Sequence, residues 1–298
     1  MSSFVSSNLG AAASFYLALY VIYGLFMTAV VFKKGFKTVY TFLWVFGLIR
    51  FLGQLCGVVY AKLGPSHYQW LIAYLVLGAE GYLTLILAAF RFTCKAQIRQ
   101  FGFSWVLTLG PFNCRLFGKP LSWKLIFQNL VLIPANVFII IGGVMLAGMD
   151  SEQLENHYEE VNLSKGLRTT GQAVFVFVTF TVVAFNIHVY AKEKVRNCLT
   201  IAVMCSSPFL LVRGIFGILA IHVTDMNYFD ASNYTSGGSA SHKLTIYEYV
   251  LGTTMEFIVA CCLVSTLAFE GDSRAIEDGT DEDKFKHIDE KNISGEKR

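Results

Sequence analysis

The chain has 298 residues, of which 54% are hydrophobic and only 15% charged, with a formal net charge of +3. Soluble globular domains carry about 25% charged residues, so this composition excludes an ordinary soluble domain and favours a membrane protein. Helical spans need about 20 mostly apolar residues, more than the roughly 10-residue strands of an outer-membrane barrel. We therefore predict an all-α bundle of seven transmembrane helices in one domain, residues 1–269. The seven apolar runs are 11–32, 38–60, 68–92, 125–148, 169–191, 199–222 and 244–269.

Lys and Arg are distributed unevenly between the connections, which predicts the orientation of the chain. The first run follows a segment without Lys or Arg and is too long for a signal-peptide core, so we interpret it as a retained span. The connections after the first, third and fifth runs carry twelve Lys and Arg residues, and the opposite connections carry four. Because cytoplasmic loops are enriched in positive charge, we expect the N-terminus outside and the C-terminus in the cytosol.

The second and third runs each hold one charged residue near their centre. Arg50 interrupts the apolar stretch "GLIRFLG", and Glu80 lies in "LVLGAEGYL". Glu80 is also the sole acidic residue among the first 149. The short connection "AKLGPSH" makes these two runs antiparallel neighbours, so we predict an Arg50–Glu80 ion pair at mid-membrane.

The connection at 91–124 is basic and also carries aromatic residues, in "FGFSWVL". Basic residues interleaved with aromatic ones are typical of a segment that lies on the inner leaflet and contacts anionic lipids. A partly buried loop would have the same composition. The sequence leaves both interpretations open.

The sixth and seventh runs repeat the pattern of the second and third. Arg213 lies in "LLVRGIFG" and Glu256 in "TTMEFIV", so we predict a second ion pair between them. Runs one to three and five to seven also share an orientation, with the fourth run as a connector. This layout suggests a 3+1+3 arrangement of parallel repeats, as in some transporters. Within the connector, Pro134 and Asn136 predict a bend with a polar cap for freed backbone groups.

The four charges at mid-membrane need partners. A central Arg or acidic residue costs about 2.5–3.5 kcal/mol on insertion scales, so four unpaired groups would cost on the order of 10 kcal/mol. Ion pairs or contact with a watery cavity are therefore required. The charges then form either a substrate site or proton-linked switch, or clamps that fix helix register, and the sequence leaves both open. Gln54 lies one turn beyond Arg50, and Tyr247 and Glu248 lie near the outer mouth. These three residues either line an outward-facing vestibule or cap helix ends.

Two connections that we expect outside carry acceptor sequences for N-glycosylation, at Asn162 ("NLS") and Asn233 ("NYT"). The tail at 270–298 has ten acidic and six basic residues and no long apolar run. That composition predicts a disordered cytosolic segment.

The motifs of common enzymes are absent from the sequence. There is no HExxH, no inward-facing His cluster for zinc, no GxSxG and no P-loop. We therefore expect no catalytic residues, no metal or other cofactor, no enzyme activity and no nucleic-acid binding. The topology matches G-protein-coupled receptors, but the third run is followed by "RFTCKAQ" rather than an acidic-Arg-Tyr triplet, and the seventh lacks the Asn-Pro-x-x-Tyr pattern.

Four blocks together resemble a family of uncharacterised fungal membrane proteins with seven spans, a domain of unknown function; they are "KKGFKTVYTFLWVFGLIRFLGQ", "GLRTTGQAVFVF", "SPFLLVRGIFGIL" and "TTMEFIVACCLV". The resemblance covers about residues 11–269. That family is distantly similar to the fungal lipid-translocating exporter and resistance proteins of the Rta type, which also carry Arg and Glu in late spans. "GAEGYLTLI" departs from this pattern because no proline follows the Glu. The resemblance implies a fungal source and a membrane location, and it carries no activity or site residues.

These observations predict a multi-pass protein of the plasma membrane or an endomembrane. The leading function is transport, lipid translocation or resistance, with a lipid or small molecule as the partner and the two Arg/Glu pairs at mid-membrane. A receptor-like sensor that signals through the basic cytosolic loops is one alternative. A structural membrane protein, whose charge pairs only hold the bundle together, is the other.

Overall fold

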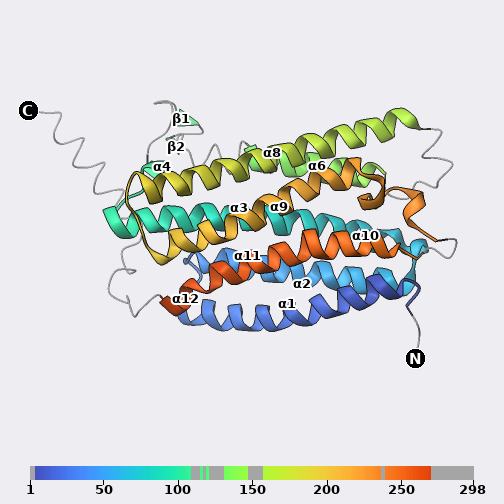
Figure 1. The fold of residues 1–298 in the computed structure, drawn as a ribbon, viewed down its shortest axis with the longest axis horizontal. Coiled ribbons are helices and arrows are strands. Elements are labelled where there is room, and N and C mark those ends of the chain that lie inside the picture. The colour runs from blue at the N-terminus through green and yellow to red at the C-terminus, as the bar shows by residue number, and fades with distance from the viewer. Residues whose placement is uncertain are drawn as a thin grey trace, which may run out of the picture.

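The structure is a computed structural model, and it describes residues 4–108, 115–116, 119–120, 131–146, 157–235 and 239–269. It is a bundle of long helices that lie side by side along the long axis of the molecule (Figure 1). Six helical stretches are long and apolar enough to cross a membrane; they are α1 (Ser7–Lys34), α2 (Tyr40–Leu63), α3 (Tyr68–Phe101), α8 (Tyr158–Ala191), α9 (Cys198–His222) and the continuous stretch His242–Phe269. The prediction of a multi-pass helical bundle is confirmed.

The last stretch is built from four segments. They are α10 (His242–Tyr247), the π-helical η5 (Glu248–Thr254), α11 (Met255–Val264) and α12 (Thr266–Phe269). A π-helix has i→i+5 hydrogen bonds and is frequently found at functional sites. Here the π-helical segment ends at Thr254, two residues before Glu256, which lies in the first turn of α11.

The fourth predicted span, 125–148, is represented by a shorter helix. Residues 131–146 contain α6 (Ile133–Met145), which packs against α8, and the remainder of the predicted span lies outside the described residues. At 1.5 Å per residue, 13 helical residues extend about 20 Å, less than the roughly 30 Å thickness of the hydrocarbon core. The count of seven spans therefore stays a prediction.

The remaining elements connect the helices. They are the 3-10 turns η1 (Pro65–His67), η3 (Thr224–Met226) and η4 (Ala231–Asn233), the short helix α4 (Trp105–Thr108), and the antiparallel two-residue strands β1 (Arg115–Leu116) and β2 (Lys119–Pro120). The predicted tail at 270–298 lies outside the described residues.

Two helices are longer than the predicted spans. α3 and α8 each have 34 residues, which corresponds to about 50 Å and exceeds the hydrocarbon core by several turns. Parts of the polar segments that we interpreted as loops, at 91–101 and 158–168, are therefore helical. The reason is that polar residues outside the bilayer continue a helix without cost, until α3 ends at Gly102 in the left-handed conformation (φ 80°).

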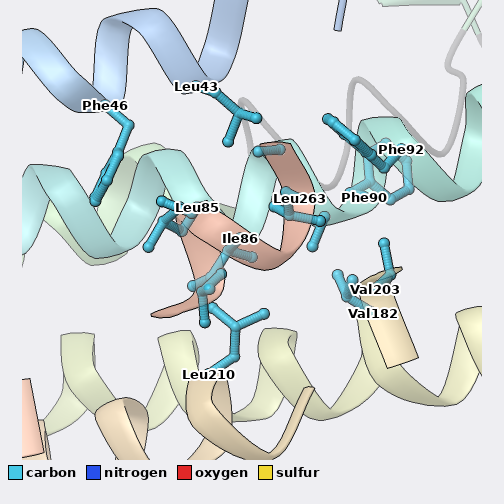
Figure 2. Packing of buried hydrophobic residues seen from close by; sticks show 14 of the residues in the cluster. Leu43, Phe46, Leu85, Ile86, Phe90, Phe92, Val182, Val203, Leu210 and Leu263 are labelled. Atoms are coloured by element: carbon cyan, nitrogen blue, oxygen red, sulfur yellow. The ribbon is translucent and has the colours of Figure 1, made fainter. Parts of the chain in front are cut away.

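Helix α3 lies at the centre of the bundle, where it contacts α2, α6, α8, α9 and α11. Figure 2 shows the apolar part of this centre, with Leu43 and Phe46 from α2, Leu85, Ile86, Phe90 and Phe92 from α3, Val182 from α8, Val203 and Leu210 from α9, and Leu263 from α11. Phe46, Leu85 and Phe92 are fully buried. Burial of this apolar surface holds the helices together and fixes which of their faces point inward.

The outward faces of the bundle are also apolar. Phe15, Ile22 and Leu25 on α1 and Phe177 on α8 are each more than 60% exposed. Contiguous apolar surface of this kind is unusual in soluble proteins, and it fits the lipid environment of a multi-pass membrane protein.

One end of the bundle carries the starts of α1, α3, α8 and α10, and we call it the N-terminal end. The opposite end, the basic end, carries the exposed residues Lys33, Lys34, Lys192, Lys194 and Arg196. Here Glu193, after α8, accepts hydrogen bonds from Gln97 Nε2 of α3 at 2.7 Å and Trp105 Nε1 of α4 at 2.8 Å. This single carboxylate therefore joins three elements at the basic end.

Candidate functional site

A buried carboxylate at the centre of the bundle is shared by two arginines. Glu256 of α11 is completely buried. Its Oε2 lies 2.7 Å from Arg50 Nε of α2, and its Oε1 accepts a hydrogen bond from Arg213 Nε of α9 at 2.5 Å. The predicted Arg213–Glu256 pair is therefore present. We call Arg50, Glu256 and Arg213 the ion triad.

Arg50 reaches Glu256 by crossing the surface of α3, where two glycines leave room. A β-carbon at Gly81 would lie 2.7 Å from Arg50 Cδ and 3.2 Å from Glu256 Oε2, and one at Gly78 would lie 3.5 Å from Arg50 Nη1. Arg50 Nη2 also donates to Thr253 Oγ1 at 3.3 Å. The long guanidinium side chain thus fills a space that the small residues of α3 leave open.

The hydrogen bonding of Arg50 is incomplete. Its contact with Glu256 Oε2 is close enough for an ion pair but lacks the alignment of a hydrogen bond, and within the described part of the chain Arg50 Nη1 has no hydrogen-bond partner. A guanidinium group offers five N–H donors, and unsatisfied donors in a buried site are costly. The Arg50 side of the triad is therefore held by charge attraction more than by hydrogen bonds, whereas Arg213 Nε donates a hydrogen bond to Glu256.

Arg213 is placed by aromatic side chains as well as by Glu256. Its guanidinium carbon lies 5.3 Å from the ring centroid of Tyr82 and 5.8 Å from that of Phe216, both within the range of cation–π attraction. The Tyr82 hydroxyl is in turn hydrogen-bonded to Thr179 Oγ1 at 2.8 Å. The position of Arg213 is thus fixed by α3, α8 and α11 together.

The predicted Arg50–Glu80 pair is wrong. Among the described residues, Arg50 pairs with Glu256, and Glu80 Oε1 instead accepts a hydrogen bond from Asn136 Nδ2 of α6. The reason is rotation: successive residues of an α-helix point about 100° apart, so the face of α3 that turns Gly81 toward Arg50 turns Glu80 toward α6. Asn136 therefore binds a carboxylate, and not the backbone groups that we predicted for it.

A second acidic side chain is buried near the triad. Glu248 is 9% exposed, and its Oε1 accepts a hydrogen bond from the Tyr74 hydroxyl at 3.3 Å. Gln54, which we predicted as a vestibule residue together with Glu248 and Tyr247, is fully buried and accepts from the Tyr249 hydroxyl at 3.1 Å. Of the three predicted vestibule residues, only Glu248 lines the pocket described next.

A pocket lies beside the triad, between α3, α6, α8 and α9, toward the N-terminal end. Its cavity volume is about 130 Å³, room for several water molecules. Arg213 forms part of its wall, which connects the pocket directly to the ion triad; the other polar wall residues are Tyr74, Tyr82, Arg168, Gln172, Asn227, Tyr228 and Glu248. Apolar side chains such as Leu75, Ile139, Ile140 and Ile221 complete the lining.

Sequence reasoning missed Arg168 and Gln172 as site residues. Both belong to α8 and line the pocket, whereas the predicted fifth span begins at residue 169 and leaves Arg168 in the connection before it. Their spacing was a usable signal, because residues at i and i+4 lie on one face of a helix. Among the described residues, no group of three or more His, Cys, Asp or Glu side chains is arranged to hold a metal ion.

The two glycosylation candidates lie in different surroundings. Asn162 is exposed in the second turn of α8. Asn233 is only 4% exposed, and its Nδ2 donates to the backbone oxygens of Thr224 and Asn227. Since a glycan would replace one of these N–H groups, the folded chain favours Asn162 of the two. Glycosylation of either site stays a prediction.

The described part of the basic connection at 91–124 carries both exposed and packed aromatic side chains, and its contact with anionic lipids stays a prediction. Phe101 and Phe103 are exposed, at 46% and 55%, as a segment on a lipid surface requires. Trp105 and Val106, by contrast, pack against the bundle. Residues 109–114, 117–118 and 121–124 lie outside the described part of the chain.

The fold and the triad define a polytopic helical membrane protein with a charged, buried centre and a pocket beside it. Residues 118–270, just over half of the chain, match the domain of unknown function DUF7702, and the chain belongs to that family. No curated protein and no solved structure matches it.

Proposed function

We propose that this protein is a membrane transporter of the lipid-translocating or resistance type, in which the pocket receives the substrate and the ion triad responds to it. The observation that carries the proposal is the double role of Arg213. It lines the pocket and also forms an ion pair with Glu256 at the centre of the bundle. A substrate in the pocket therefore contacts one member of the triad.

The shape of the triad supports a site over a simple clamp. A buried ion cluster that only fixes helix register works as a dry, closed contact. Here two arginines share one carboxylate, and one of them faces a hollow that is large enough for water. If a substrate attracts Arg213, Glu256 keeps Arg50 as its partner, so the contact between α9 and α11 can weaken without leaving the acid unpaired.

The positions of the charges support an orientation of the pocket in the membrane. The basic end carries exposed Lys and Arg residues, and cytoplasmic ends of membrane proteins are enriched in these residues. The pocket lies toward the opposite, N-terminal end. In this proposal the pocket therefore opens to the outer or lumenal side, and the protein needs no catalytic residue, metal or cofactor.

The test is transport by the purified protein in proteoliposomes. NBD-labelled phosphatidylserine and phosphatidylcholine report lipid movement through the loss of fluorescence on adding dithionite outside. We expect faster movement than in protein-free vesicles for at least one lipid, and a loss of most of that activity in Arg213→Gln. Arg196→Gln, at the basic end, is the matched control and should retain it. If folded wild-type protein moves neither lipid faster than empty vesicles, the transport proposal is wrong.

A receptor-like sensor is the second candidate, because the pocket and the basic end lie at opposite ends of the bundle. In that case a ligand in the pocket would act through the triad on α9 and α11, which contact each other along the bundle. Ligand binding without any transport, together with a ligand-dependent change in the accessibility of the basic end, would favour the sensor.

A further inference from the structure

We propose that the pocket is a binding site for a single anionic group, a carboxylate or phosphate, with Arg168 as its anchor. This inference rests on the proposed function only in that it names the substrate class of the same pocket. A binding site of this kind would serve a transporter and a sensor equally.

Arg168 is a buried cation without an acid. Its side chain lines the pocket and the residue is 7% exposed. Its Nε and Nη2 have no hydrogen-bond partner in the described structure, and no described carboxylate forms an ion pair with it. A buried charge without a partner is strongly unfavourable, so the ligand-free pocket leaves an electrostatic requirement that a bound anion would meet.

Arg168 is also held in place, as an anchor must be. Its guanidinium carbon lies 4.6 Å from the ring centroid of Phe229. On the other side, a β-carbon at Gly142 of α6 would lie 2.8 Å from Arg168 Cγ. The aromatic ring on one side and the backbone of α6 at Gly142 on the other therefore confine the stem of Arg168. Its Nε and Nη2 edge stays without a partner among the described residues. Arginine presents such an edge as a rigid fork that suits the two oxygens of a carboxylate or phosphate.

The charges around the pocket favour one negative charge. Of the charged residues that line the pocket, Arg168 and Arg213 contribute two positive charges and Glu248 one negative charge, which leaves +1. Behind them, the charges of Arg50 and Glu256 cancel each other. Glu256 is already shared by the two other arginines, and Glu248 is bound to Tyr74.

Glu80 does not neutralise Arg168. It accepts its hydrogen bond from Asn136 and is not a pocket-lining residue. An anion in the pocket would therefore meet a cation that no described carboxylate has already engaged.

A second donor faces the same pocket. Tyr228 lines the pocket, and its buried hydroxyl makes no hydrogen bond of regular geometry within the described residues, although the Tyr74 hydroxyl lies close enough to interact with it. Burial raises the pKa of the Tyr228 phenol well above its usual value, so the group stays protonated and remains a donor. Two donors on one pocket, one of them charged, match the acceptor oxygens of an anion.

The apolar part of the lining indicates an amphiphile as the carrier of the anion. Leu75, Ile139, Ile140 and Ile221 line the pocket together with the polar groups. A lipid-like molecule would place its charged head at Arg168 and its chain against these side chains. A small free anion would use Arg168 alone, and the experiment separates the two sources.

The experiment measures binding by purified protein in an uncharged detergent, through calorimetry and the shift in the thermal unfolding midpoint. The probes are decanoate, decanol with the same chain but no charge, and inorganic phosphate. We expect saturable binding of decanoate, at least tenfold weaker binding of decanol, and loss of decanoate binding by tenfold or more in Arg168→Gln. Arg196→Gln should bind as wild type does.

Arg168→Gln also tests the anchor without any ligand. Since the substitution removes an unpaired buried charge, the ligand-free variant should unfold at the same or a higher temperature than wild type. Tyr228→Phe, which keeps the ring and loses only the hydroxyl, should weaken decanoate binding to a smaller degree. Phosphate binding that depends on Arg168 and equals that of decanoate would assign the anion site to a free anion.

Two results would overturn the anion site. One is decanoate binding that is unchanged in Arg168→Gln, and the other is decanol binding as tight as that of decanoate. Arg168-dependent binding in a protein that moves no lipid would keep the anion site and reject only transport. Lipid movement by a protein whose decanoate binding does not depend on Arg168 would reject the anion site and keep transport.

Discussion

Arg50 and Glu256 belong to the second and the last long helix, yet Arg50 Nε lies 2.7 Å from Glu256 Oε2 at the centre of the bundle. Because Arg213 binds the other oxygen of the same carboxylate, three helices depend on one acidic side chain. The triad carries an excess positive charge, and it meets the pocket through Arg213. Stability and the proposed function are therefore coupled at this carboxylate.

Loss of the shared acid should destabilise the fold more than loss of Glu80. Glu256→Gln leaves two buried guanidinium groups without a counter-charge, which costs roughly 3–5 kcal/mol. Glu80→Gln keeps an oxygen that can accept from Asn136, so its effect should be smaller. SDS-induced unfolding in mixed micelles measures both variants, and equal losses would contradict the triad.

Arg50 should be coupled energetically to Glu256 and not to Glu80. In a double-mutant cycle, Arg50→Gln with Glu256→Gln should give an interaction energy of about 0.5–3 kcal/mol, the range for residues in contact. The cycle of Arg50→Gln with Glu80→Gln serves as the control and should be close to additive. A larger coupling to Glu80 would restore the pairing that the sequence suggested.

Gly81 should tolerate no side chain. Gly81→Ala would place a β-carbon 2.7 Å from Arg50 Cδ, and because the ion pair fixes Arg50, overpacking should cost about 1–3 kcal/mol. Gly166→Ala on α8 is the matched control, since nothing lies within 4 Å of its β-carbon. Alanine has the higher helix propensity, so this control should be neutral or stabilising by up to about 1 kcal/mol. Unfolding midpoints that fall equally would refute the close approach.

Asn136 should act on stability through Glu80. Asn136→Ala removes the donor to the Glu80 carboxylate, and an unsatisfied, partly buried acceptor costs about 1–3 kcal/mol. Asn136→Asp should lose more than Asn136→Ala at neutral pH, because two carboxylates would then face each other. The reverse order in thermal unfolding would show that Asn136 has another role.

The sequence predicted the class of the protein and the positions of its long helices well. Apolar runs and charge counts are local properties, so six long helical stretches could be placed from them, and the ends at Gly35, Gly64 and Gly102 follow from positive φ angles that glycine adopts easily. The sequence predicted the lengths of the helices less well than their positions. α8 begins at Tyr158 and not at 169, because hydropathy marks the bilayer-length part of a helix and not its polar extension.

The candidate site was only partly predictable. The Arg213–Glu256 pair followed from two charges on neighbouring helices, and it is present. The Arg50–Glu80 pair followed from the same logic and failed, because proximity along the chain does not determine which face of α3 meets α2. Arg168 was not predicted at all, since its burial depends on α6 and on Phe229 from a later connection.

The sequence by itself therefore determined that this chain is a multi-pass helical membrane protein with charges that need partners, because apolar runs and uncompensated charges have free-energy costs that hold in any arrangement of the helices. Only the tertiary structure decided which charges meet. The rotation of each helix about its axis is set by packing against all its neighbours at once. The side chains of successive residues Glu80 and Gly81 point about 100° apart on α3, so Gly81 faces Arg50 and leaves it room to reach Glu256. The packing of α6 and Phe229 around Arg168 placed that arginine at the pocket without an acidic partner among the described residues.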